Sequence, residues 1–156
     1  MKSPLISKIE FNLFEVSIPN IGADPSGFGV WYDPGPGTPQ KRFAVRIYTD
    51  NGSVGEYVPP RSRATVIMPA AVALAHFLIQ KPALERERHY QTMRRATKHV
   101  GEAGIGALDI ALWDLGGKIC GQSICQMLGG HRGKLPAYAS TIPGDERTCR
   151  GDGQER

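Results

Sequence analysis

The strongest structural signal in this sequence is the segment GIGALDIALWDLGGKICGQSICQMLGG, residues 104–130. From Gly106 onward its large apolar residues recur at helical spacing, and four of them form one stripe: Leu108, Leu112, Leu115 and Ile119. This spacing predicts a helix that buries one face. Gly121 is expected to end that helix, because glycine adopts left-handed backbone angles at little cost. A short helical turn is predicted over 123–128, before Gly129 and Gly130.

The same helix also carries a charged pair on its other side and two adjacent glycines. Asp114 and Lys118 lie four residues apart, the spacing of an ion pair on one helix face. Gly116 and Gly117 together cost roughly 2 kcal/mol of helix stability relative to alanine. A cost of this size indicates that another part of the molecule, such as a second backbone, packs closely against them.

The residues before this helix predict an antiparallel sheet followed by further helices. Apolar and polar residues alternate over 6–18 and 42–49, and Asn51-Gly52 predicts a tight hairpin that leads into a return strand over 53–58. The segment 19–40 holds five prolines and five glycines, so no regular element is expected there. Helices are predicted over 65–80 and 83–99. The fold class is therefore α+β, a three-stranded antiparallel meander followed by a helical bundle.

The residues after the short helical turn change in character. Residues 131–134 form a polar linker and 135–140 are predicted as one more strand. Beyond Ile142 the sequence contains no aromatic residue and no large aliphatic residue, so residues 143–156 are expected to be disordered. A truncation or a shifted reading frame after about Asp145 is the interpretation that this change favours.

Composition excludes several classes of protein. Hydrophobic residues make up 40% of the 156 residues and charged residues 22%, as in a globular protein. The net charge of +4 comes without an uninterrupted basic stripe, so no nucleic-acid partner is expected. No apolar run reaches the roughly 20 residues that span a bilayer, so no membrane association is expected. Three cysteines without a metal-binding spacing favour reduced thiols and a cytoplasmic location.

The run GALDIALWDLGGK, followed by GQ, LGG and PAYAS, resembles the mandelate racemase/muconate lactonizing enzyme family of the enolase superfamily. The resemblance covers roughly residues 6–141 and implies an N-terminal capping domain over 1–130, with a linker and the first barrel strand over 131–142. Family members add a (β/α)-barrel that holds one Mg²⁺ on three acidic side chains. Lysine or histidine bases of that barrel remove the proton α to a carboxylate.

The resemblance also implies what this chain lacks. A barrel takes roughly 250 residues, and no position here corresponds to the metal ligands or the bases. No catalytic or metal-binding residue is therefore assigned, and Mg²⁺ is expected in the complete enzyme but not on this chain. The leucine stripe around Trp113 is expected to lie against the absent barrel. The parent reaction is expected to be acid-sugar dehydration, otherwise racemisation or cycloisomerisation.

Within the chain, two stretches are candidates for contact with a carboxylate-containing small molecule. In the family two capping-domain loops close over the barrel, and by position these are 19–40 and 57–63. Aromatic side chains there could exclude water, and arginines could hold a carboxylate by two hydrogen bonds. The candidates are Phe28, Trp31, Tyr32, Arg61 and Arg63. The alternative is that the aromatics anchor their own loop and the arginines are solvated.

A second class of function stays open at this point. Without a barrel, bare helix faces could drive the chain to bind a full-length relative or to form a homo-oligomer, because large exposed apolar patches favour association. The chain would then be a non-catalytic binding or oligomerisation module.

Overall fold

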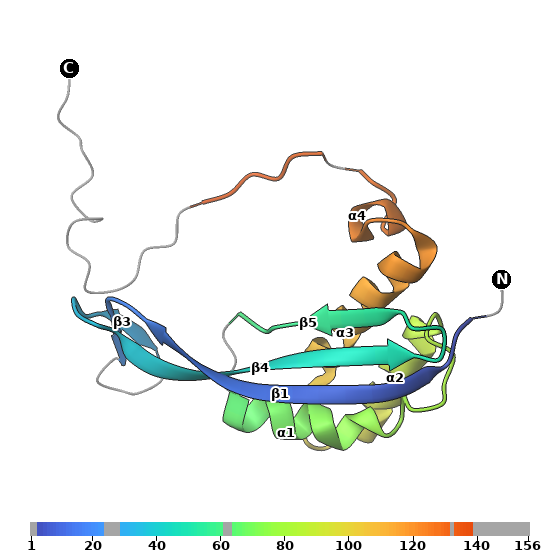
Figure 1. Cartoon of the computed structure of the whole chain (residues 1–156), viewed down its shortest axis with the longest axis horizontal. Helices are drawn as coiled ribbons and strands as arrows, with labels where there is room; N and C mark the ends of the chain where they lie inside the picture. Colours follow the sequence, from blue (N-terminus) through green and yellow to red (C-terminus); the bar gives the residue numbers. More distant parts are fainter. Residues whose placement is uncertain (1–2, 24–28, 61–63, 132, 139–156) are drawn as a thin grey trace. The chain divides into compact units, whose positions relative to one another are not determined.

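The computed structural model describes residues 3–23, 29–60, 64–131 and 133–138. The chain divides into two compact units, residues 1–14 with 41–133 and residues 15–40 with 134–156 (Figure 1). The first unit holds the sheet and the helices. The part of the second unit treated below is the arm, residues 15–40.

The sheet has three strands in the order β1-β4-β5. They are β1 (Ile6–Ile18), β4 (Thr38–Thr49) and β5 (Val54–Tyr57). In β4 buried Phe43, Val45, Ile47 and Thr49 alternate with more exposed residues, so one face of the sheet is apolar. The predicted antiparallel meander is confirmed.

The β4–β5 turn is a three-residue loop rather than a two-residue one. Thr49 N–H donates to Ser53 O at 3.0 Å, and Gly52 has a φ of 84°. Asn51 does not have a positive φ, and its side-chain oxygen accepts from Thr49 Oγ1 at 2.6 Å and from the Ser53 N–H at 3.1 Å. The hairpin was therefore predicted correctly, but Asn51 contributes a side-chain acceptor rather than left-handed backbone angles.

The first two helices are shorter than predicted. Helix α1 spans Ala64–Ala75 and α2 spans Arg86–Ala96. Between them the chain pairs with the start of the sheet, because Gln80 N–H donates to Ile6 O at 2.8 Å and Ile6 N–H donates to Lys81 O at 2.9 Å. Gln80 takes a φ of 61° to make this turn. Tertiary hydrogen bonds to β1 therefore end α1 earlier and start α2 later than the apolar pattern indicates.

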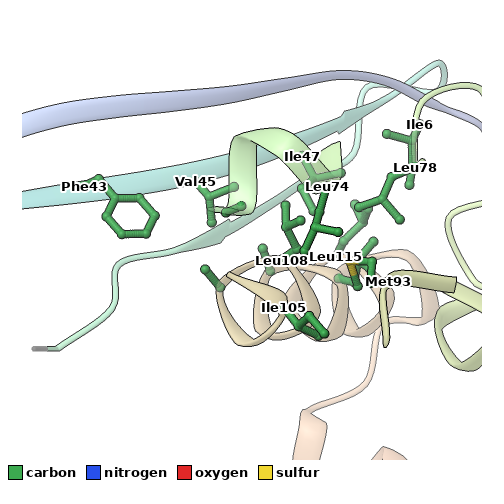
Figure 2. Close-up of a cluster of buried hydrophobic side chains, with 14 of the residues drawn as sticks. Ile6, Phe43, Val45, Ile47, Leu74, Leu78, Met93, Ile105, Leu108 and Leu115 are labelled. Atoms are coloured by element: carbon green, nitrogen blue, oxygen red, sulfur yellow. The ribbon is translucent and has the colours of Figure 1, made fainter. Parts of the chain in front are cut away.

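The core lies between the sheet and the helices (Figure 2). Helix α3 (Ile105–Cys120) places Leu108, Leu112 and Leu115 in the same buried cluster as Phe43, Val45 and Ile47 of β4. The expectation that the leucine stripe lies against an absent barrel is wrong. The sheet has an apolar face that must be covered, and α3 covers it with those leucines.

Two glycines allow α3 to approach its neighbours closely. A Cβ on Gly55 of β5 would lie 2.3 Å from the Ala111 carbonyl oxygen, and a Cβ on Gly104 would lie 2.5 Å from the Ala71 nitrogen of α1. Inside α3, a Cβ on Gly117 would lie 2.8 Å from the backbone oxygen of Gln122. The prediction of a backbone close to the glycine pair is confirmed for Gly117. Gly116 makes only ordinary contacts, with the side chains of Met127 and Leu84.

Helix α3 ends as predicted, and a shorter helix follows. Gly121 has a φ of 64° and closes α3. Helix α4 (Ile124–Met127) begins with a capping box, in which Ser123 Oγ accepts from the Gln126 N–H and the Gln126 side chain accepts from the Ser123 N–H. Residues 135–138, the described part of the predicted strand 135–140, form no strand in this chain. A parallel barrel strand needs neighbouring strands for its hydrogen bonds. The predicted disordered tail, 143–156, lies outside the described residues.

The arm contains regular structure that the sequence analysis did not predict. Strand β2 (Ile21–Ala23) pairs antiparallel with β3 (Val30–Tyr32), and β4 already begins at Thr38. The prediction of no regular element over 19–40 is therefore wrong. Three-residue strands leave room for prolines and glycines around them, so the composition of the segment does not exclude a hairpin.

Candidate functional site

Two of the five residues predicted to contact substrate, Trp31 and Tyr32, are described by the structure, and both lie in the arm. Trp31 and Tyr32 are neighbours on β3, where Trp31 pairs with Gly22 and Tyr32 pairs with Ile21. Side chains of consecutive strand residues point to opposite faces of the ribbon. Trp31 is 44% exposed and Tyr32 is half-buried, so the indole is the more accessible ring. Phe28, Arg61 and Arg63 lie outside the described residues.

The base of the arm is held by hydrogen bonds around Asn20. This residue has a φ of 59°, and its carbonyl accepts from the Asp33 N–H at 3.2 Å. Its N–H donates to Gly35 O at 3.3 Å, and its side-chain oxygen accepts from the Gly35 N–H at 3.3 Å. Thr38 Oγ1 donates to Ile21 O at 2.7 Å. Asparagine tolerates left-handed angles and can bond its own turn, so one residue fixes the direction of the strand that ends in Trp31 and Tyr32.

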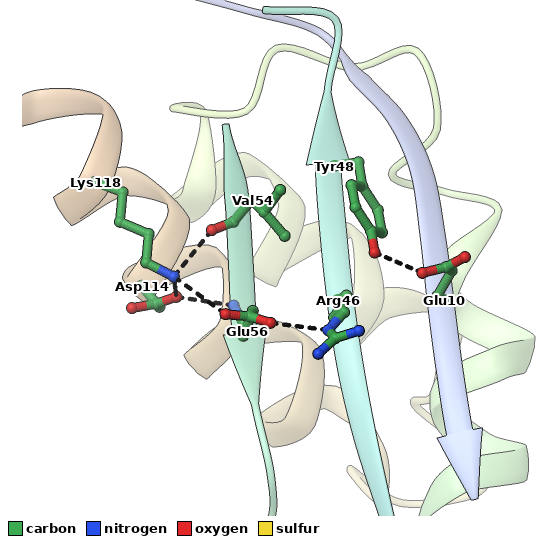
Figure 3. Close-up of polar contacts among 7 residues, drawn as sticks. All are labelled: Glu10, Arg46, Tyr48, Val54, Glu56, Asp114 and Lys118. Carbon is green, nitrogen blue, oxygen red and sulfur yellow. Dashed lines mark hydrogen bonds and ion pairs between the residues drawn. The ribbon is translucent and has the colours of Figure 1, made fainter. Parts of the chain in front are cut away.

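A network of charged side chains runs from Arg46 of β4 over Glu56 of β5 to Asp114 and Lys118 of α3 (Figure 3). Arg46 Nε donates to Glu56 Oε1 at 2.8 Å, and Lys118 Nζ lies 3.7 Å from Glu56 Oε2 and 2.7 Å from Asp114 Oδ2. The predicted Asp114–Lys118 ion pair is confirmed. The hydrogen bond that Arg46 donates to the Glu56 carboxylate raises the pKa of the Arg46 guanidinium.

A second polar cluster lies on β1 and β4. Tyr48 Oη donates to Glu10 Oε2 at 2.6 Å, and Lys8 forms an ion pair with Glu10. The hydrogen bonds from Lys8 and Tyr48 lower the pKa of the Glu10 carboxyl, and the bond to Glu10 raises the pKa of the Tyr48 hydroxyl. All of these groups are paired within the sheet, so we assign them no chemistry on a substrate.

A pocket of about 300 Å³ lies beside Trp113, between α2, α3 and α4. The Arg86 guanidinium stacks over the Trp113 ring, 4.0 Å from its centroid, and donates to Asp109 Oδ1 at 2.8 Å. Leu84 and Met127 complete the apolar part of the wall. Sequence reasoning missed this arrangement because Arg86 and Asp109 are 23 positions apart. The signal in the sequence was an aspartate placed four residues before Trp113, on the same side of the helix.

The described side chains that could bind a metal ion do not lie together in one site. Among residues 3–23, 29–60, 64–131 and 133–138, no group of three histidine, cysteine, aspartate or glutamate side chains could hold a metal ion. Mg²⁺ needs oxygen ligands arranged nearly octahedrally, commonly one or two carboxylates with further oxygens. Asp109, Asp114 and Glu56 instead pair with arginine or lysine. These residues do not fit a Mg²⁺ site.

The described helices include none that is long and apolar enough to cross a membrane. Cys120 and Cys125 are exposed free thiols.

Comparison with known proteins gives one family. Residues 37–129 match the model of the mandelate racemase / muconate lactonizing enzyme N-terminal domain. A D-galactonate dehydratase of Pectobacterium atrosepticum is 34% identical over 113 residues, which is 69% of this chain and 29% of that protein. The chain thus spans less than a third of this curated relative.

Two solved structures share the fold. D-glucarate dehydratase from Agrobacterium tumefaciens, complexed with magnesium, superposes with a TM-score of 0.75 over 93% of this chain and 38% of its own, at 24% identity. The 3,6-anhydro-D-galactonate cycloisomerase from Zobellia galactanivorans gives a TM-score of 0.63 over 80% of this chain and 32% of its own, at 26% identity. The predicted α+β fold class and the predicted resemblance are both confirmed. This chain belongs to the mandelate racemase/muconate lactonizing enzyme family, whose N-terminal domain it carries.

Proposed function

We propose that this chain is the substrate-capping part of an enzyme that removes the proton α to a carboxylate with the help of Mg²⁺, and that the parent reaction is the dehydration of an acid sugar. The observation that carries the proposal is the family match over 37–129 together with 34% identity to a D-galactonate dehydratase. A bound divalent ion would offset the negative charge that develops on the carboxylate. Under the proposal, residues 1–130 form the capping domain and 131–142 are the linker and first barrel strand.

The capping role assigns one task to this chain's own side chains, which is to close the substrate site and exclude water. Trp31 is the best described candidate, because it is a large, partly exposed ring on a strand whose base is fixed by Asn20. Arg61 and Arg63 come four and six positions after the last residue of β5 in the sequence and would hold a substrate carboxylate by paired hydrogen bonds. Phe28 and Tyr32 would complete the apolar wall.

The isolated chain is expected to be catalytically silent, since its described residues do not fit a Mg²⁺ site. The direct test is a chimera in which residues 1–130 replace the capping domain of the D-galactonate dehydratase. We expect Mg²⁺-dependent turnover of at least one sugar acid, and a kcat/KM that falls about tenfold or more when Trp31→Ala or Arg61→Ala is introduced. A folded chimera with no turnover on any sugar acid contradicts the proposal.

The second candidate is a binding module, and α4 is the observation that favours it. None of the four residues of α4 is buried, and Ile124 and Leu128 are 38% and 66% exposed. Such residues gain free energy when a partner covers them. Size-exclusion chromatography with and without a full-length relative tests this function. A monomer that does not bind the relative contradicts it.

A further inference from the structure

The outer edge of β5 is the place where this sheet could grow. Among the strands that the structure describes, the order β1-β4-β5 leaves β5 with β4 on one side only. An edge strand presents backbone N–H and C=O groups at every second residue, and these form a template for another strand. In β5 the groups that point away from β4 belong to Val54 and Glu56, and both meet side chains of α3 (Figure 3).

Two of these backbone groups, the Glu56 N–H and the Val54 C=O, have a partner of the opposite hydrogen-bonding type on α3. Asp114 Oδ2 accepts from the Glu56 N–H at 2.8 Å, and Lys118 Nζ donates to Val54 O at 3.0 Å. The two side chains also contact each other at 2.7 Å, so each charge is held in place by the other. A carboxylate facing an N–H and an ammonium facing a C=O reproduce the acceptor and donor that a neighbouring strand would offer.

The side chains of α3 can meet the backbone of β5 because one turn of α-helix and two residues of β-strand have nearly the same rise. Four residues of α-helix rise about 6 Å, and two residues of β-strand rise about 6.7 Å. One helical turn of α3 therefore separates the backbone positions of Asp114 and Lys118 by about the same rise as those of Glu56 and Val54. The absence of a side chain on Gly55 brings α3 close enough, because a Cβ there would collide with the Ala111 carbonyl.

At the opposite edge of the sheet, the start of β1 is paired with backbone instead. Ile6 exchanges hydrogen bonds with Gln80 and Lys81 at 2.8 and 2.9 Å. The start of β1 is thus covered by a segment of main chain, whereas the outer side of β5 meets two side chains.

We propose that Asp114 and Lys118 substitute for a neighbouring strand, and that they prevent a second copy of this chain from adding its own β5 to the sheet. The proposal stands on the contacts of β5 and α3 and is independent of the enzymatic function above. Its rival is that the two residues only form an ion pair that stabilises α3.

A charge exchange separates the two explanations. The double variant D114K/K118D keeps the net charge and an ion pair at the same spacing. It places an ammonium against the Glu56 N–H and a carboxylate against the Val54 carbonyl, so like groups face each other. If the pair matters only to the helix, the Glu56 amide exchange and the mass in solution stay unchanged, and only α3 loses a small amount of stability from the reversed charge order. If the pair occupies the strand edge, both backbone groups lose their partners.

The first readout is amide hydrogen exchange of the full chain, resolved at Glu56 and measured at a concentration low enough for the variant to be monomeric, because an added strand would itself protect this amide. We expect exchange roughly tenfold faster or more in D114K/K118D, because a hydrogen bond to a charged group is lost. The second readout is the mass in solution by light scattering, which should exceed that of the unsubstituted chain at equal concentration. Adding Glu56→Pro, which removes the outward N–H, should abolish the excess mass.

Single variants cover the case in which the exchange of charges prevents folding. D114N keeps a carbonyl acceptor for Glu56 and should protect its amide, whereas D114A removes the acceptor and should speed exchange by roughly tenfold. Glu56→Gln is the control, because it alters the ion pairs and keeps the backbone contacts. Equal Glu56 exchange in D114A, D114N and the unsubstituted chain overturns the proposal, as does a folded D114K/K118D with unchanged mass.

Discussion

The helix-covered sheet and the arm are held together by different interactions. In the sheet unit, Leu108 and Leu115 of α3 are fully buried against Phe43 and Ile47 of β4. In the arm, the described structure depends on a three-residue pairing of β2 with β3 and on hydrogen bonds around Asn20. Buried apolar area stabilises the first, and turn geometry directs the second.

We infer from this difference that the helix-covered sheet provides stability and that the arm is suited to recognition. A strand held mainly by turn hydrogen bonds can change its side chains without disturbing a core, and binding residues are commonly found on such segments. Trp31 is therefore in a place where substitution should alter substrate contact more than folding. The four predictions below test this division, beginning with the largest expected effect.

The core should respond most strongly. Leu108→Ala should lower the free energy of unfolding by about 2–5 kcal/mol, because it leaves a cavity among fully buried side chains. Leu13→Ala makes the same chemical change at a residue that is 55% exposed and should cost about 0.5 kcal/mol or less. Urea denaturation measures both. Similar losses in the two variants would mean that the core is not where the structure places it.

The close approach of α3 to β5 should give the next largest effect. Gly55→Ala should cost about 1–3 kcal/mol, because its Cβ would meet the backbone of Ala111 and Leu115. Gly106→Ala is the matched control inside α3, where a Cβ meets nothing within 4 Å. It should stabilise the chain by about 0.5–1 kcal/mol, because alanine favours the helix. Thermal denaturation shows the two opposite signs, and a neutral Gly55→Ala would contradict the close contact.

The arm should respond locally. Gly37 has a φ of 97°, and a Cβ there would lie 2.3 Å from Ile18 O, so Gly37→Ala should introduce strain of about 1–3 kcal/mol. We expect faster amide exchange in β2 and β3 with little change in the unfolding midpoint of the sheet unit. Gly35→Ala adds a Cβ in open space and should leave the exchange unchanged. A loss of global stability in Gly37→Ala would show that the arm and the sheet unfold together.

The smallest effect should be the pH dependence contributed by Glu10. Its pKa is lowered by Lys8 and Tyr48, so its contribution to stability is present above the unfolded pKa of about 4.3 and is lost as the pH falls through the folded value. The pKa of Tyr48 is raised by Glu10, so its contribution is present below the unfolded pKa of about 10 and is lost as the pH rises through the folded value. Glu10→Gln should slightly reduce the change of unfolding free energy with pH at both the acid and the alkaline end, measured by denaturation at pH 3–11. The effect is small because exposed pairs are screened.

The sequence predicted an element correctly where its apolar repeat continues over many residues. Helix α3 was predicted to within a residue of its start at Ile105 because its apolar spacing continues over four turns, and the alternation in β4 located the apolar face of the sheet. The ending at Gly121 was predicted from one residue type with a strong local preference, and the helical turn at Ser123 was predicted without its capping box.

The rest required information that lies far apart in the sequence. A helical stripe shows that a face is buried but not what covers it, which is why the leucines were assigned to a barrel instead of to β4. Strands of three residues are too short to show a period, so β2 and β3 were missed. The helix ends at Ala75 and Arg86 are set by pairing with β1, more than 70 positions away. For the candidate site, only Trp31 and Tyr32 fall within the described residues.

The hydrogen bonds from α3 to β5 also constrain the order of folding. The β4–β5 hairpin closes a short loop, but the Glu56–Asp114 bond joins residues 58 positions apart and the Leu84–Ser3 bond joins residues 81 apart. Closing long loops costs chain entropy before any contact is gained. A chain leaving the ribosome can form its hairpin early, yet its β5 edge stays open until Lys118 has emerged. We therefore expect nascent chains in which Lys118 has not yet emerged to associate wrongly through β5 more readily than longer chains.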